Sequence, residues 1–134
     1  MSKKLIIYLA FIGLIGLLFS CEKDETKVIM SASPVAPTLT TVPDLTLQRA
    51  KGANMLEFVG TAVDPGFAAS ANYFLEACAS GNKFANTVSL VSAIDPASMK
   101  ISVSDLNGIL IKKFPTDATS SIDIRLRAVL VVDA

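Results

Sequence analysis

The segment Ile-Asp-Ile-Arg-Leu-Arg-Ala-Val-Leu-Val-Val-Asp, residues 122–133, carries the most regular pattern in the chain. Every second side chain from its first isoleucine onward is apolar, and the positions between them begin with Asp123, Arg125 and Arg127. Successive side chains of a β-strand point to opposite faces of its sheet. The alternation therefore predicts a long strand with one face in a core and the other face in solvent at its start.

Shorter segments of β character precede this strand, with turn signals between them. Strands are predicted at residues 55–62, 72–79, 87–91 and 100–103, with a broken first strand around Leu39, Leu45 and Leu47. The turns are marked by Asp-Pro-Gly at residues 64–66, Ser-Gly-Asn at 80–82 and Asp-Pro at 95–96. Within residues 72–79, Phe74, Glu76 and Cys78 share one face. We expect that face to be only half buried, because it includes a charged residue.

One helix is predicted, at residues 105–113. Ser104 is placed to cap it, Leu106, Ile109 and Leu110 recur at helical spacing, and Pro115 stops it. We expect this helix to be a short crossover between strands.

These elements together predict an all-β protein. About seven short strands with one helical crossover indicate an antiparallel immunoglobulin-like β-sandwich over residues 38–134. A small barrel is the alternative fold. A strand as long as the one at residues 122–133 normally pairs on both sides, so we expect the domain to lack its last strand, which would follow Ala134.

The amino-terminal segment reads as an export signal. Lys3 and Lys4 precede an uncharged apolar run at residues 5–19, which is shorter than the roughly 20 residues of a spanning helix. The run ends at Ser20 and Cys21, and with Leu18 these residues resemble a bacterial lipobox. We therefore expect a lipoprotein signal peptide at residues 1–20, and not a transmembrane anchor.

Lipidation of Cys21 would hold the mature protein on a membrane, since two or three acyl chains anchor far more firmly than one. Residues 21–37 then form a lipidated tether and a linker, whose prolines at positions 34 and 37 favour an extended conformation.

The composition excludes several functional classes. The chain has no histidine and no tryptophan, and Cys78 is its only cysteine besides Cys21. Cys78 has no imidazole to activate it, so we interpret it as a semi-buried small apolar group. The formal net charge is zero, which argues against a nucleic-acid partner. No phosphate-binding loop or metal-ligand spacing occurs, so we expect no cofactor, no metal site and no enzymatic activity.

The charged residues offer few catalytic arrangements. Glycoside hydrolysis would require a pair of carboxylates, and the candidates are Glu57 with Asp64 and Glu76 with Asp123. Acidic residues on strands and turns are, however, ordinarily solvated. Arg125 and Arg127 share a face with Asp123, which predicts cross-strand ion pairs; binding of an anion by the two arginines is the alternative.

Sugar binding needs exposed aromatic faces. Tyr73 and Phe58 lie on predicted core strands, and Phe67, Phe84 and Phe114 flank turns, where we expect them to plug the ends of the sandwich. Of these aromatic side chains, we expect only that of Phe67 to be available at the surface for a ligand. The sequence identifies no ligand-binding residues.

Six segments occur in an order that resembles the amino-terminal domain of SusE-type outer-membrane lipoproteins. They are Cys21-Glu-Lys-Asp-Glu, Ala36-Pro-Thr-Leu, Tyr73-Phe-Leu-Glu-Ala, Gly81-Asn-Lys-Phe-Ala-Asn-Thr-Val, Ser104-Asp-Leu-Asn-Gly-Ile-Leu and Ile124-Arg-Leu-Arg-Ala-Val. The resemblance implies an immunoglobulin-like first domain that lifts later carbohydrate-binding domains away from the membrane. Those later domains, and the tryptophan common in the second strand region, are missing from this sequence.

The resemblance also implies a location and partners. Lys23, Asp24 and Glu25, which follow the lipidated cysteine after Glu22, resemble a surface-export signal, so we expect a lipid-anchored outer-membrane protein at the cell surface. It would serve as a noncatalytic spacer or scaffold in a starch-type polysaccharide binding and uptake system, with SusC/SusD-like transporter components as partners. The alternatives are a directly carbohydrate-binding module and a cell-envelope interaction module that pairs through its final strand.

Overall fold

The computed structural model describes residues 29–131, and within them the chain forms six strands, an α-helix and a short 3-10 helix. The elements are β1 (Leu39–Thr41), η2 (Arg49–Lys51), β2 (Met55–Gly60), β3 (Ser70–Ala79), β4 (Val88–Ala93), β5 (Met99–Ser102), α2 (Val103–Lys113) and β6 (Ile122–Val131). The predicted signal peptide, Cys21 and residues 132–134 lie outside the described part of the chain.

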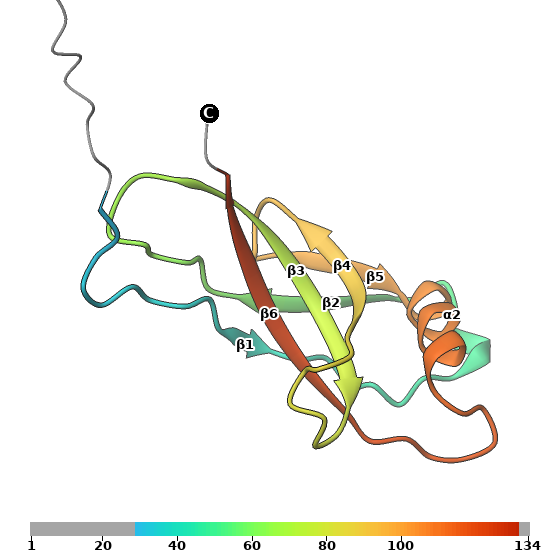
Figure 1. Cartoon of the computed structure of the whole chain (residues 1–134). Coiled ribbons are helices and arrows are strands. Elements are labelled where there is room, and N and C mark those ends of the chain that lie inside the picture. Colours follow the sequence, from blue (N-terminus) through green and yellow to red (C-terminus); the bar gives the residue numbers. More distant parts are fainter. Residues whose placement is uncertain (1–28, 132–134) are drawn as a thin grey trace, which may run out of the picture.

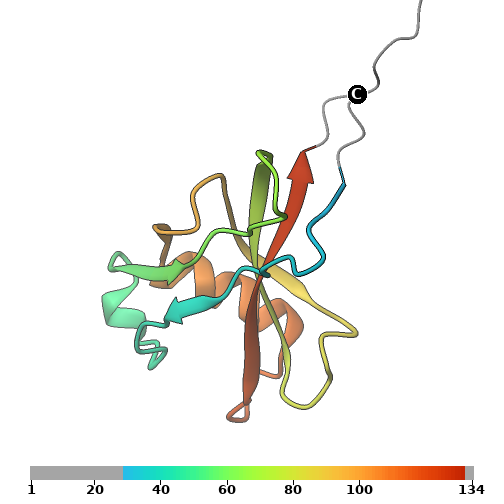
Figure 2. The ribbon, with the colours of Figure 1, turned by 90° about the vertical axis from the view of Figure 1, so that its left-hand side faces the viewer.

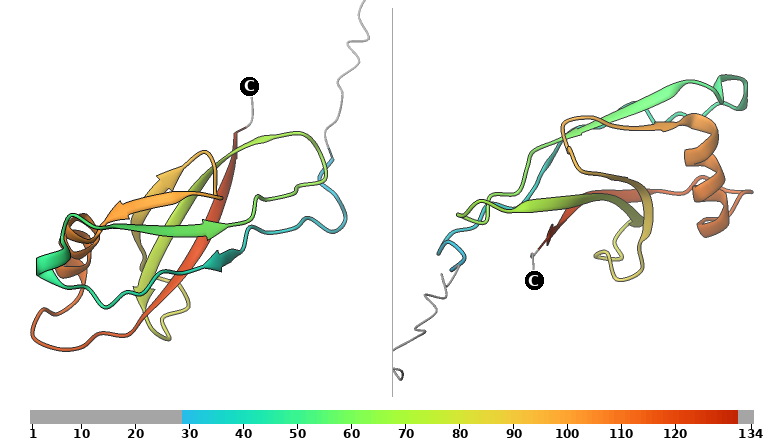
Figure 3. Two further views of the ribbon diagram at one scale, coloured as in Figure 1. Left: turned by 180° about the vertical axis from the view of Figure 1, so that it is seen from behind. Right: turned by 90° about the horizontal axis from the view of Figure 1, so that it is seen from above.

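Two three-stranded antiparallel sheets pack face to face (Figure 1; Figure 3, right). One sheet has the order β1-β2-β5 and the other the order β4-β3-β6. The helix α2 connects β5 in the first sheet to β6 in the second, and it covers one end of the molecule. The architecture confirms the predicted antiparallel immunoglobulin-like sandwich with one helical crossover.

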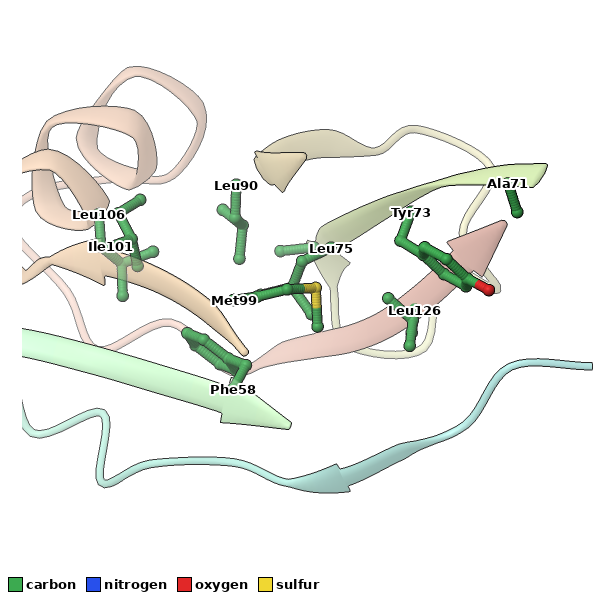
Figure 4. Close-up of a cluster of buried hydrophobic side chains, with 10 residues drawn as sticks. Phe58, Ala71, Tyr73, Leu75, Leu90, Met99, Ile101, Leu106 and Leu126 are labelled. Carbon is green, nitrogen blue, oxygen red and sulfur yellow. The ribbon is translucent and has the colours of Figure 1, made fainter. Parts of the chain in front are cut away.

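The core lies between the sheets and is built around β3, the middle strand of its sheet (Figure 4). Leu75 projects from β3 toward Met99 of β5 and Phe58 of β2, the Tyr73 ring lies beside Leu126 of β6, and all of these side chains are buried. Leu106 of α2 closes the core at the helix end. Full burial of one such side chain stabilises the fold by about 1.5–3 kcal/mol.

The long final strand is confirmed as β6. It pairs with β3 over ten residues in an unbroken antiparallel register, from Ser70 opposite Val131 to Ala79 opposite Ile122. Its apolar row, which includes Leu126, faces the core.

The helix is confirmed, but its predicted cap is wrong. The hydroxyl of Ser102, and not that of Ser104, accepts the backbone N–H of Asp105 at 3.0 Å and donates to the Asp105 carboxylate at 2.7 Å. Ser102 is therefore the N-cap of α2, which starts directly at the end of β5. The helix ends at Lys113, before Pro115, as predicted.

Two predictions about strands are wrong. Leu45 and Leu47 do not extend the first strand, because the Asp44 carboxylate accepts the backbone N–H of Thr46 at 2.9 Å and turns the chain after β1. Both leucines still pack against the core, and residues 29–131 form six strands where about seven were predicted for the domain. The outer face of β3 is also more buried than expected, since Glu76 is 5% and Cys78 0% exposed.

Part of the segment predicted as a linker docks on the domain. Val35 and Asp64 exchange two backbone hydrogen bonds of 2.8 and 2.9 Å, and the N–H of Ser31 donates to the carbonyl of Pro65 at 2.9 Å. Gly66 adopts a φ of 85° against Ser31, a conformation that favours glycine. The docked segment and the end of β6 both lie at the end of the sandwich away from α2 (Figures 1 and 2).

Candidate functional site

The outward face of the β4-β3-β6 sheet carries a connected group of charged side chains, which we call the Glu76 cluster: Glu76, Arg125 and Arg127. Arg125 donates from Nε to Glu76 Oε2 at 3.0 Å, and its Nη2 forms an ion pair with the same oxygen at 2.9 Å. Arg127 donates from Nε to Oε1 at 2.8 Å. Each carboxylate oxygen therefore has its own guanidinium, and the cluster as a whole has one excess positive charge.

Strand register explains this pairing. Glu76 lies directly opposite Arg125 in the β3–β6 ladder, and Phe74, two residues earlier, lies opposite Arg127. Opposite and diagonal neighbours on one face of an antiparallel pair are within reach of long side chains. Both arginines therefore meet the one carboxylate on the middle strand.

Two phenylalanine rings complete the site. The Arg125 guanidinium carbon lies 4.6 Å from the centroid of Phe84, and that of Arg127 lies 4.7 Å from the centroid of Phe74. Phe84 and its neighbour Lys83 have φ angles of 56° and 51°. These left-handed conformations turn the β3–β4 loop back over the outer face of the sheet. Cation–π contacts of this kind contribute about 0.5–1 kcal/mol each when partly exposed.

The environment of Glu76 lowers its pKa. Burial of the carboxylate acts to raise the pKa, but the hydrogen bonds from Arg127 and Arg125 and the charges of the two arginines together outweigh burial. Glu76 is therefore ionised at neutral pH and is fully engaged as a hydrogen-bond acceptor. A carboxylate held in this way is unsuited to act as a general acid.

The cross-strand ion pairs predicted for Arg125 and Arg127 are confirmed, with Glu76 as their acid. Asp123, on the same face, instead accepts hydrogen bonds from the Ser80 hydroxyl and the Gly81 backbone N–H, both at 3.0 Å. It thereby ties the turn after β3 to the start of β6.

The acids of both candidate carboxylate pairs have local partners in the structure. Glu57 of β2 accepts a hydrogen bond from Ser98 at 2.7 Å and lies 3.7 Å from the Lys100 ammonium. Asp64 accepts the N–H of Gly66 at 2.8 Å within its own turn. Each acidic group of the two pairs is thus engaged by its own local partners, as expected of solvated or structural carboxylates.

The positions of the aromatic side chains agree with the prediction only in part. Tyr73 and Phe58 are core residues as expected, and the Tyr73 hydroxyl accepts the N–H of Val63 at 3.1 Å. Phe67 is half-buried. Phe84 does not plug an end of the sandwich: its ring lies under Arg125 on the outer face.

Cys78 is fully buried, and not semi-buried as predicted. Within residues 29–131 no three cysteine or acidic side chains gather as a group that could hold a metal ion. In the same range no helix is long and apolar enough to cross a membrane.

A groove of about 500 Å³ lies beside α2, between the helix, the segment after β1 and the loop before β6. Its apolar lining comes from Leu45, Leu47, Leu110, Ile111, Phe114 and Ile122. Arg49 is its only charged lining residue. The groove offers apolar contact but no arrangement of reactive groups.

The predicted lipidation site Cys21 and the predicted export residues Lys23, Asp24 and Glu25 lie outside the described residues, so they stay predictions. What sequence reasoning missed is the role of Glu76 and Phe84. The alternation of β3 and β6 placed Glu76 and the two arginines on outward faces, but it did not indicate which strands are neighbours.

Comparison with known proteins assigns the chain to a family. The family model described as SusE outer membrane protein matches residues 23–127, which include the docked segment, both sheets up to the middle of β6, and α2. Searches of the curated proteins and of the solved structures found no match. The match covers well over half of the chain, and the chain therefore belongs to the SusE outer membrane protein family.

Proposed function

We propose that the chain is a lipid-anchored lipoprotein of the outer membrane, and that its immunoglobulin-like domain is a noncatalytic spacer in a SusE-like polysaccharide binding and uptake system. The family supports an outer-membrane component of such a system. The lipid anchor, the position at the cell surface and the starch-type glycan belong to the proposal.

One observation favours a spacer over a binding module. The two phenylalanine rings of the outer sheet face, Phe74 and Phe84, each have an arginine of the same domain stacked on them. A pyranose ring would have to displace a guanidinium that also holds Glu76. The aromatic surface is thus already used within the domain.

The docked segment sets the reach of the proposed tether. Ser31 is bound to Pro65, so only the residues between Cys21 and Ser31 separate a lipid anchor from the domain. Fully extended, these ten steps span at most about 35 Å. The domain would stand close above the membrane and would face it with the end opposite α2.

The anchor is tested by metabolic labelling with radioactive palmitate. The chain has two cysteines, so Cys78→Ala is a matched control for Cys21→Ala. We expect label in the wild type and in the Cys78→Ala variant, and none in the Cys21→Ala variant. Label that persists without Cys21 would refute the anchor.

Surface exposure and glycan binding need separate tests. Protease added to whole cells should degrade the protein, and replacing Lys23, Asp24 and Glu25 by alanine should protect it while palmitate labelling continues. In gels containing starch we expect the isolated chain to migrate without retardation. Retardation that is lost in a Phe74→Ala variant would instead support direct carbohydrate binding, since Phe74 adjoins a shallow depression with polar Asn72 and Ser92.

A further inference from the structure

The segment at residues 29–36 is held on the domain by its backbone, while all of its side chains are exposed. Two of its residues make backbone hydrogen bonds to the turn at residues 64–66. A docked segment normally turns its apolar side chains inward, because their burial stabilises the contact. Here the apolar side chains of Ile29, Met30 and Val35 are instead 72%, 55% and 57% exposed.

These three side chains are a third of the nine large apolar side chains exposed within residues 29–131, although the segment has only eight residues. Single exposed apolar residues are ordinary on a folded domain, whereas several at one place mark a contact with a partner or with lipid. The segment and the turn at residues 64–66 project beyond the end of β6 and form the end of the sandwich opposite α2 (Figure 1; Figure 3, right). We call this projecting part the tip.

The tip and the loops beside it lack basic side chains. The loops that meet at this end of the sandwich are residues 29–38, 61–69 and 94–98, and they contain no lysine or arginine and only two acids, Asp64 and Asp95. Each of these carboxylates accepts a backbone N–H of its own turn, at 2.8 and 2.9 Å. At the opposite end, η2 and α2 together carry four basic residues. The tip can therefore approach lipid with few charged groups to remove from water.

We propose that the tip rests on the lipid surface of the membrane that holds the chain, with Ile29, Met30 and Val35 in contact with the headgroups and the first acyl carbons. The inference rests on the proposed anchor at Cys21. Ile29 follows Cys21 by eight residues, so it lies at most about 28 Å from the anchor. A protein partner at the tip would have to fit between the domain and the bilayer, and lipid is the occupant that this short tether favours.

Lipid contact at the tip gives the domain a direction that the anchor alone does not. Association of apolar side chains with a membrane interface increases with the apolar area that they bury, and it requires no partner of fixed shape. The anchor keeps the chain at the membrane, and the tip holds the long axis of the sandwich away from it, with α2 outermost.

The test measures which end of the sandwich touches lipid. The full chain is reconstituted in vesicles of phosphatidylcholine with brominated acyl chains, because bromine quenches the fluorescence of a tryptophan that reaches the acyl region. The chain has no tryptophan of its own, so Val35→Trp reports on the tip alone. Ile111→Trp is the matched control, at a side chain that is 50% exposed on α2.

We expect Val35→Trp to lose about half of its fluorescence relative to vesicles without bromine, and Ile111→Trp to lose under about a tenth, since interfacial contact buries side chains about 5–10 Å deep. Met30→Ser, added to Val35→Trp, should reduce this quenching about twofold, because it removes apolar area from the contact. Met55→Ser is its control, since Met55 is 59% exposed at the start of β2, near α2, and it should leave the quenching unchanged.

The proposed anchor and the tip contact can fail separately. The uncharged run at residues 5–19 also holds the unprocessed chain on vesicles, so quenching does not require palmitate. Quenching of Val35→Trp in a chain that takes up no palmitate would support the tip contact and refute the anchor.

Several results would overturn the proposal. They are equal quenching at both tryptophan positions, quenching at Ile111→Trp alone, quenching at neither position, and quenching that Met30→Ser does not reduce. Val35→Trp emission that shifts to the blue in cell envelopes, but is not quenched in vesicles, would identify a protein as the occupant of the tip and would equally refute it.

Discussion

Replacing Glu76 by glutamine should destabilise the domain by about 2 kcal/mol. Glutamine has the shape of glutamate but offers one acceptor oxygen and an NH2 group. That NH2 group would face an arginine N–H donor, on either Arg125 or Arg127. One guanidinium would lose its partner, and the cluster would become a pair of positive charges without a counterion.

The magnitude follows from the exposure of the three side chains. The side chains of Arg125 and Arg127 are 40% and 41% exposed. Each ion pair therefore resembles a surface salt bridge, which contributes about 0.2–1 kcal/mol to stability. The Glu76 side chain is only 7% exposed, and a buried polar group that loses its partners costs about 1–3 kcal/mol. These contributions together give the figure of about 2 kcal/mol, or a fall of about 8–16 °C in Tm for a domain of this size.

The effect should depend on pH in a defined direction. The pKa of Glu76 is lower in the folded domain than its ordinary value of 4.5, so the native state favours the ionised carboxylate. Its contribution to stability is complete above the unfolded pKa and is lost as the pH falls through the folded pKa. The difference in unfolding free energy between wild type and the Glu76→Gln variant should therefore be constant from pH 7 to about 5 and should shrink below about 4.5.

Urea unfolding of both proteins at several pH values measures this difference. Glu57→Gln is the matched control, since Glu57 is likewise a strand carboxylate with a hydrogen bond, from Ser98, and an ion pair, with Lys100, but its side chain is 49% exposed. We expect that control to cost under about 1 kcal/mol. A Glu76→Gln variant no less stable than Glu57→Gln, or one whose deficit grows at acid pH, would refute the reasoning.

Three further substitutions test the fold by the same urea measurement. Ser102→Ala should cost about 1 kcal/mol through loss of the helix cap, while Ser104→Ala should leave stability nearly unchanged; equal effects would contradict capping by Ser102. Gly60→Ala should cost about 1–3 kcal/mol, because the added methyl would overlap Leu126 Cδ2 and crowd the Thr38 carbonyl at 3.0 Å; a neutral result would mean that the sheets separate there easily. Gly108→Ala should stabilise the helix by about 0.5–1 kcal/mol, since the new methyl meets open space, and destabilisation would show that α2 packs differently at that position.

The sequence was most informative where burial repeats with a fixed period. In β3 and β6 the core takes every second residue, so the alternation alone identified both strands and their inward faces. The helix was found for the same reason, from the spacing of Leu106, Ile109 and Leu110. Its start was misplaced by two residues, although the sequence held the signal, a serine three residues before Asp105.

The Glu76 cluster could not be predicted from the pattern of any single strand. Asp123 shares a strand face with the arginines, whereas Glu76 lies 49 residues from Arg125 in sequence and meets it only through the register of the ladder. Phe84 reaches the cluster because Lys83 and Phe84 adopt positive φ angles, which residues other than glycine seldom do. No local sequence signal marks that turn of the loop.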